Sequence, residues 1–241
     1  MIPPSIPALG LELAVDVRAA IAELWLQRAR SESSVGCVFE QLAGELAATG
    51  AHAEVVALAR SAIGDEARHA ATCLELAAAY GAAAPTLAPL TVRLPDYVSD
   101  ARLRATLHAI NLCCIGETIA TAFVEACVGA CAEGVLRELH GRHLADEIHH
   151  ARVGWAHVAT LTEPERAAVA PWLARVLEAQ LGAWERRIGE LPEAGSPGHG
   201  YPPRAALLET VRAAVRELVL PGFAHGAIDI AAARAWFDGR A

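Results

Sequence analysis

The residues best suited to chemistry lie in a five-residue pattern that occurs twice. It reads Asp-Glu-Ala-Arg-His at 65–69 and Asp-Glu-Ile-His-His at 146–150. On a helix, residues three apart share a face, so each copy presents a carboxylate and an imidazole toward one point. The two pairs are Glu66 with His69 and Glu147 with His150. Carboxylate and imidazole together suit iron, manganese and related metals, so each pair indicates part of a metal site.

A single glutamate stands upstream of each pair, inside an apolar helical pattern. Glu32 precedes Glu66 by 34 residues, and Glu117 precedes Glu147 by 30 residues. Each spacing fits one helix, a short turn and a second helix that returns beside the first. Four such helices would bring these carboxylates and both imidazoles to one buried point, as in the dinuclear metal sites of four-helix bundles.

The residues around Glu117 argue against a purely structural role for this side chain. The segment 111–124 is largely apolar and contains no basic residue to pair with the carboxylate. A buried, ionised carboxylate is strongly destabilising unless it is paired or bound to a metal. A pair of metal ions would supply the missing positive charge; the alternative is a bundle that has lost its metal.

These residues resemble the ferritin-like di-iron carboxylate superfamily, which includes ferritins, rubrerythrins, ribonucleotide reductase small subunits, bacterial multicomponent monooxygenases and arylamine N-oxygenases. The resemblance covers about residues 15–161 and implies a ferritin-like four-helix bundle with two iron ions; manganese or a mixed manganese–iron pair is the alternative. By position, the ligand roles fall to Glu32, Glu66, His69, Glu117, Glu147 and His150. Glu40 and Glu45 share the helix of Glu32, but the small residues around Glu32 and its hairpin spacing match the second half better.

Two aspartates are expected to orient the histidine ligands. Metal-bound histidines usually donate their other ring N–H to a carboxylate. Asp65 and Asp146 each precede a ligand glutamate, and we expect them to act crosswise, Asp65 on His150 and Asp146 on His69. The alternative is that both aspartates are merely polar and exposed.

His143 shares a helix face with Glu147 and His150. The resulting H-x-x-x-E-x-x-H pattern is similar to that of the arylamine N-oxygenases, which implies a third histidine ligand. The alternatives are a histidine hydrogen-bonded near the site or one on an exposed face. His140, a further turn away, is expected to be a neighbour of the site, and His149 to point elsewhere.

Other small and polar residues are expected to shape a substrate pocket. Thr121 resembles the active-site threonine of the bacterial multicomponent monooxygenases, although its hydroxyl could equally bond back to its own helix. Cys73 occupies the position at which radical-generating reductase subunits carry a tyrosine, so the resemblance to those subunits fails there. The predicted pocket consists of Gly36, Cys37, Cys73 and Cys113. Core packing is the alternative for these cysteines.

No segment alternates polar and apolar residues with a period of two, so the fold is predicted to be all-α. Long helices are expected at about 15–49 and 52–80, from Ser99 or Asp100 to Cys131, and at 133–161, with an extended crossover at 81–98. A capping box at 162–165 begins a fifth helix that reaches about 191 and bends at Pro171, and helices near 204–218 and 227–238 follow a loop at 192–203. We predict one domain, 1–241, with a core bundle at about 15–161 and a helical extension at 162–241.

Composition excludes several other classes of protein. The net charge of −8 argues against nucleic acid as the main partner. The N-terminal residues lack the basic and apolar regions of a secretory signal, and the 6 cysteines follow no disulfide framework, so the cytoplasm is the expected location. His108 and Glu117 interrupt the apolar run at 105–124, which argues against a membrane span.

The resemblance implies a non-haem di-iron oxygenase that activates O₂ to oxidise a small organic substrate, with N-oxygenation of an amine ahead of C–H hydroxylation or desaturation. A separate reductase or ferredoxin would supply electrons, because the chain has neither a G-x-G-x-x-G motif nor a cysteine cluster. The rivals are a ferroxidase or peroxide-scavenging iron protein and a bundle with a structural metal site. Substrate identity stays open, and a homodimer is one oligomeric state compatible with this interpretation.

Overall fold

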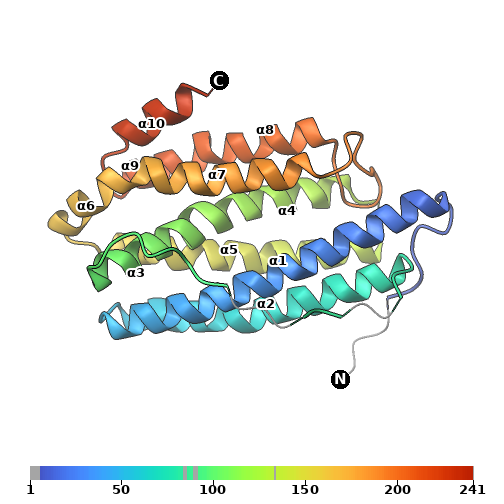
Figure 1. Ribbon diagram of the computed structural model, residues 1–241, viewed down its shortest axis with the longest axis horizontal. Helices are drawn as coiled ribbons and strands as arrows, with labels where there is room; N and C mark the ends of the chain where they lie inside the picture. The colour runs from blue at the N-terminus through green and yellow to red at the C-terminus, as the bar shows by residue number, and fades with distance from the viewer. Residues whose placement is uncertain (1–5, 84–85, 89–91, 133, 241) are drawn as a thin grey trace.

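The computed structural model describes residues 6–83, 86–88, 92–132 and 134–240. Within these ranges the secondary structure is helical, with isolated β-bridges around residue 131 and residues 196–201. The all-α prediction is therefore confirmed. The helices form three stacked layers, which can be followed from the bottom to the top of Figure 1.

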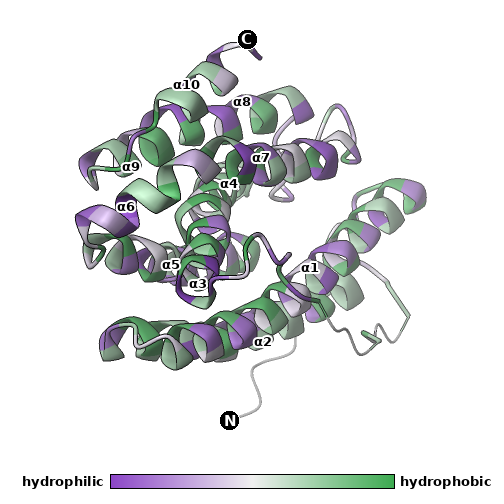
Figure 2. Cartoon of the chain, turned by 60° about the vertical axis from the view of Figure 1, so that its left-hand side comes forward, coloured by the Kyte–Doolittle hydropathy of each residue, from purple (hydrophilic) through white to green (hydrophobic). Residues whose placement is uncertain are grey.

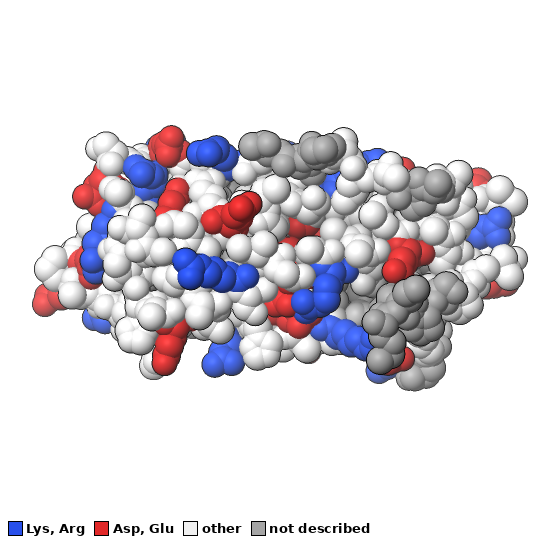
Figure 3. Space-filling view, turned by 90° about the horizontal axis from the view of Figure 1, so that it is seen from below, with Lys and Arg blue, Asp and Glu red and all other residues white. Residues whose placement is uncertain are grey.

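The first layer is an antiparallel pair, α1 (Val15–Ala48) and α2 (Ala53–Ala79). Each helix is followed by a glycine with positive φ, Gly50 at 75° and Gly81 at 102°, a conformation that glycine adopts without steric penalty. The outer face of this layer is shown in Figure 3, where arginines and acidic side chains intermingle on the part of the surface that is described. Both helices begin and end within two residues of the predicted limits.

The middle layer contains the most hydrophobic run of the chain. This run comprises α3 (Ala101–Ala109), the π-helix η1 (Ile110–Glu117) and α4 (Thr118–Ala130). It packs against α5 (Val135–Ala159), the second helix of the layer. Asp100 caps α3 by accepting a hydrogen bond from the N–H of Leu103, at 2.7 Å. The π-helical stretch was not predicted from the sequence.

The run from Ala101 to Ala130 is long and apolar enough to cross a membrane, with a mean hydropathy of 1.5. However, 56% of its most apolar 18-residue window is buried inside the molecule. Figure 2 shows it between the other two layers, as expected for a core helix. Length and composition are therefore weak evidence for a membrane span here.

The third layer consists of the C-terminal helices. The capping box of Thr162 and Glu165 begins α6 (Glu163–Val169), and a 3₁₀ turn at Ala170–Trp172 forms the predicted bend before α7 (Leu173–Gly189). The remaining elements are α8 (Arg204–Ala214), the π-helix η3 (Val215–Val219), α9 (Leu220–His225) and α10 (Ala231–Asp238).

Two predicted boundaries in this layer were wrong. The last helix begins at Ala231 and not near residue 227. We expected a helix to end near residue 218, before Pro221, but helical structure continues to His225. Proline donates no backbone N–H and clashes with the carbonyl of the preceding turn. The widened π-helical turn ends at Val219, just before this proline, which lets the helix continue.

Candidate metal centre

The structure brings all seven predicted ligands together between the first two layers. Two groups of side chains each offer ligand atoms that lie within 4.8 Å of one another. The first group is Glu32, His69, His143 and Glu147; the second is Glu66, Glu117, Glu147 and His150. Every one of these residues is buried. Glu147 belongs to both groups, so its carboxylate would contribute to both positions if two metal ions were held there.

The two halves of the repeated pattern are interleaved in this centre. Glu66 groups with residues of the second half, whereas His69 groups with Glu32 from α1. Among the glutamates considered on α1, Glu40 is exposed and Glu45 hydrogen-bonds to His108, so Glu32 is the one that reaches the centre. The preference for Glu32 therefore agrees with the geometry.

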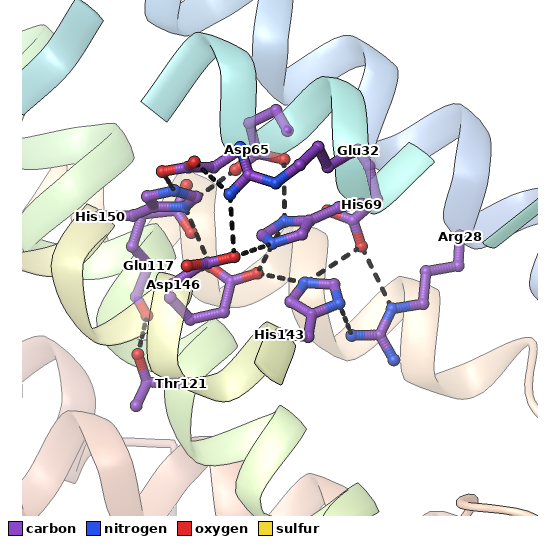
Figure 4. Close-up of polar contacts among 12 residues, drawn as sticks. Arg28, Glu32, Asp65, His69, Glu117, Thr121, His143, Asp146 and His150 are labelled. Atoms are coloured by element: carbon purple, nitrogen blue, oxygen red, sulfur yellow. Dashed lines mark hydrogen bonds and ion pairs between the residues drawn. The ribbon is translucent and has the colours of Figure 1, made fainter. Parts of the chain in front are cut away.

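The two aspartates lie crosswise, as expected. Asp146 Oδ2 is 3.1 Å from His69 Nε2, and Asp65 Oδ2 is 3.3 Å from His150 Nε2. In the neutral form of each ring, an N–H on Nε2 leaves the Nδ1 lone pair free, and both Nδ1 atoms face the carboxylates of the centre (Figure 4). This is the tautomer that a metal ligand binding through Nδ1 requires.

His143 enters the centre in a different way. Its Nε2 lies 2.5 Å from Glu147 Oε1, while its Nδ1 lies 3.3 Å from Arg28 Nη2 (Figure 4). Arginine only donates hydrogen bonds, so Nδ1 must accept and the ring proton sits on Nε2. A metal bound at Nε2 would require the ring proton to sit on Nδ1. The N–H of Nδ1 would then face the N–H of Arg28, and two donors cannot hydrogen-bond to each other. In this arrangement His143 is a hydrogen-bond donor to Glu147, and ligation requires Arg28 to move away.

Several buried polar atoms of the centre have no hydrogen-bond partner. They are both carboxylate oxygens of Glu66, Oε2 of Glu147, and Nδ1 of His69 and of His150. The Nδ1 atom of His150 approaches Glu66 Oε1 to 3.0 Å, but without the alignment of a hydrogen bond. Buried polar groups are rarely left unpaired, and a cluster of such acceptor atoms is what metal ions would satisfy.

The ionisation of the centre also indicates missing positive charge. Burial raises the pKa of Glu66 to about 7 and that of Glu117 well above its usual range, aided at Glu117 by the nearby carboxylates. Burial alone would lower the pKa of His150, but Glu147 and Glu66 raise it to about 11. Without metal, protons hold the charge balance of the site. Among the described residues no arginine forms an ion pair with Glu117, as the sequence led us to expect.

A cavity of about 550 Å³ adjoins the centre. Glu32, Glu117 and Glu147 reach its wall, together with Gly116, where a Cβ atom would lie 3.1 Å from Gln180 Nε2. The rest of the wall is mainly apolar and includes aromatic side chains. It comes from α1, the crossover at Val92 and Leu94, η1, α4, α7 and the loop before α8. The volume lies in the range of small-molecule sites.

The four predicted pocket residues do not line this cavity. They are Gly36, Cys37, Cys73 and Cys113. A Cβ on Gly36 would meet Glu66 at 3.4 Å, and Cys113 packs fully buried near Gly154. Cys73 lines a second cavity, which His69 and His143 of the centre also line. The Thr121 hydroxyl donates to Glu117 O at 2.8 Å, bonding back to its own helix.

Three arginines near the site were missed in the sequence. Arg28, one turn before Glu32, forms an ion pair with it at 3.1 Å. Arg68 lies inside the repeated pattern and contacts both Asp65 and Asp146. Their spacing from the ligands was a usable signal, whereas Arg187 on α7 reaches the cavity only through the tertiary fold.

Comparisons with protein-family models, with curated proteins and with solved structures find no match to this chain. The centre is therefore defined by its own geometry: buried carboxylate and imidazole groups that could hold metal ions.

Proposed function

We propose that this protein is a ferritin-like di-iron oxidoreductase that uses O₂ to oxidise a small organic substrate. One observation carries the proposal: two buried groups of carboxylate and imidazole ligands share Glu147 and lie beside a mainly apolar cavity. A structural metal site needs no such cavity. The bundle would consist of α1, α2, the run α3–η1–α4 and α5.

The ligand set fits two iron ions, although manganese or a mixed pair uses the same atoms. Glu32, Glu66, His69, Glu117, Glu147 and His150 would hold them. When bound, the metal pair supplies the electrons that reduce O₂, and a separate reductase or ferredoxin restores them. The glutamates balance the charge of two divalent ions, while Asp65 and Asp146 hold two imidazole rings in the ligating tautomer. The apolar cavity wall keeps bulk water away from the reacting substrate.

Oxidation of an amine at nitrogen is the first reaction to test, and C–H hydroxylation or desaturation is the second. The first rests on the position of His143 relative to Glu147 and His150, and it gains weight if Arg28 releases His143 for ligation. The second rested on Thr121, whose hydroxyl is occupied by its own helix. The free thiols fit a reducing compartment, and we place the protein in the cytoplasm.

The test begins with anaerobic ferrous loading, after which the protein is mixed with O₂ and a panel of amines and hydrocarbons. Oxygen uptake that saturates with an organic compound, together with an oxidised product, supports the oxygenase. Uptake that depends only on added iron supports a ferroxidase instead. Absence of oxygen uptake from the iron-loaded protein, with or without any organic compound, would exclude both.

A further inference from the structure

We infer that the cavity beside the metal centre binds an organic monocarboxylate, with Arg187 holding the carboxylate and the apolar wall holding the rest of the molecule. The inference rests on the proposed function to the extent that this cavity is taken as the substrate site. It adds the chemical class of the substrate, which the ligand residues do not determine.

The cavity combines apolar side chains with positively charged ones. Leu24, Val35, Leu112 and Phe123 line it, and so do Arg28, Arg30 and Arg187. Arg28 is paired with Glu32 and Arg30 with Glu23, so Arg187 is the arginine that is left for a ligand. Such a combination recognises a molecule with an apolar body and an anionic end, because apolar burial stabilises the body and a fixed charge orients it.

Arg187 forms no ion pair with a carboxylate among the described residues. In the part of the chain that the structure describes, no hydrogen bond or ion pair engages its guanidinium, which lies 5.0 Å from the ring centre of Trp184. Glu190 lines the same cavity but is not within ion-pair distance. Arg187 is an exposed residue that lines the cavity. Partial desolvation lowers its pKa, and the carboxylates of Glu32, Glu117 and Glu190 act in the opposite direction.

The charge balance of the loaded site leaves the cavity wall positive. The four glutamates of the centre would balance two divalent ions, and Arg30 is paired with Glu23. The wall then carries two positive charges, on Arg28 and Arg187, and one negative charge, on Glu190, so one positive charge is left over. A monoanion balances it, whereas a phosphate dianion would leave one negative charge.

The shape of the guanidinium favours a carboxylate over other monoanions. Its two parallel N–H groups match the two carboxylate oxygens in a bidentate pair, and such charge-assisted pairs are stronger than neutral hydrogen bonds. Trp184 lies against the guanidinium and limits its orientations. Arg187 is thus suited to hold the carboxylate end of the substrate.

The test measures binding without turnover, using the full chain loaded with zinc, which has no redox chemistry. Isothermal titration calorimetry compares phenylacetate and octanoate with the neutral analogues phenylacetamide and octanamide. We expect each carboxylate to bind at least tenfold more tightly than its amide. Arg187→Gln should remove this preference. Arg187→Lys keeps the charge but loses the two parallel N–H groups, so it should retain part of the preference.

Arg186→Gln is the matched control, because Arg186 is the adjacent arginine on α7 and does not line the cavity. It should bind phenylacetate as the unmodified protein does. Circular dichroism of each variant checks that the fold is intact. The inference is overturned if neither carboxylate binds, or if Arg187→Gln binds phenylacetate within twofold of the unmodified protein. The second result would mean that the metal, and not Arg187, takes the carboxylate.

The zinc content of the same samples separates this inference from the proposed function. Two ions per chain with no Arg187-dependent binding leaves the metal centre in place and removes the carboxylate site. If the protein holds no metal but binds the carboxylates through Arg187, the carboxylate site stands and the proposed metal-dependent oxidation is contradicted.

Discussion

At the scale of single residues, hydrogen-bond direction determines which imidazoles can bind metal. Asp65 and Asp146 accept from the Nε2 atoms of two histidines and leave each Nδ1 atom available. Arg28 does the opposite at His143, because it donates to Nδ1 and leaves the proton on Nε2. The sequence placed His143 on the ligand face, but its hydrogen-bond partner on α1 became visible only in the fold.

We predict that His143 ligates metal only after Arg28 is replaced. In the unmodified protein loaded with cobalt(II), His143→Ala should leave the visible absorption spectrum unchanged. In an Arg28→Gln background, where the amide oxygen can accept from Nδ1, the same replacement should alter the spectrum. A spectral change on His143→Ala in the presence of Arg28 would show that this arginine leaves when metal binds.

Metal binding should displace protons, and the number should depend on pH. With a pKa of about 7, Glu66 is mostly protonated at pH 6 and mostly ionised at pH 8, whereas His150, at about 11, is protonated at both. Metal must displace the protons from these ligands. Manganese(II) binding should therefore release roughly one more proton per chain at pH 6 than at pH 8.

The measurement is a titration in weakly buffered solution with a pH indicator. Glu66→Gln should lose the difference between the two pH values, and Glu40→Gln, at an exposed position on α1, should keep it. Equal proton release at both pH values in the unmodified protein would contradict the assignment.

At the scale of elements, the π-helix η1 positions Glu117. It ends at Glu117, and the Asn111 carbonyl within it accepts a hydrogen bond from Gln180 Nε2 at 2.9 Å. The helix packs on α5 at Gly154, where a Cβ would lie 2.6 Å from Cys114 Sγ and 2.7 Å from its backbone nitrogen. No side chain other than hydrogen fits there without movement of η1.

Gly154→Ala should therefore displace η1 and weaken the metal centre. Overpacking of this kind destabilises a fold by about 1–3 kcal/mol. Gly141→Ala on the same helix has no neighbour within 4 Å and should stabilise it by about 0.5–1 kcal/mol. Chemical denaturation and metal content measure both effects. Full metal occupancy and unchanged stability in Gly154→Ala would argue against the close packing of η1 on α5.

Helix limits were largely predictable because glycines, prolines and capping residues act locally. Gly50, Gly81 and the Thr162 capping box ended or began helices where expected. The π-helices were not predictable, because they arise from packing between helices that are distant in sequence. The cavity was missed for the same reason, since α7 supplies part of its wall.

At the scale of the molecule, the C-terminal layer covers the middle layer and supplies part of the cavity wall. The repeated motif and the upstream glutamates were enough to name the residues that converge. The resemblance covered only about residues 15–161, so it carried no information on α7, which contributes Gln180, Trp184 and Arg187 to the cavity. Part of the cavity wall is therefore encoded outside the segment that encodes the metal ligands.

The metal content of the protein after anaerobic ferrous loading and desalting tests the central claim most directly. The unmodified protein should hold two iron ions per chain, because the two ligand groups share only Glu147. Glu117→Ala should lower the content to one ion, while Glu40→Ala, on the exposed face of α1, should leave it at two. A content of one or fewer in the unmodified protein would contradict a dinuclear centre.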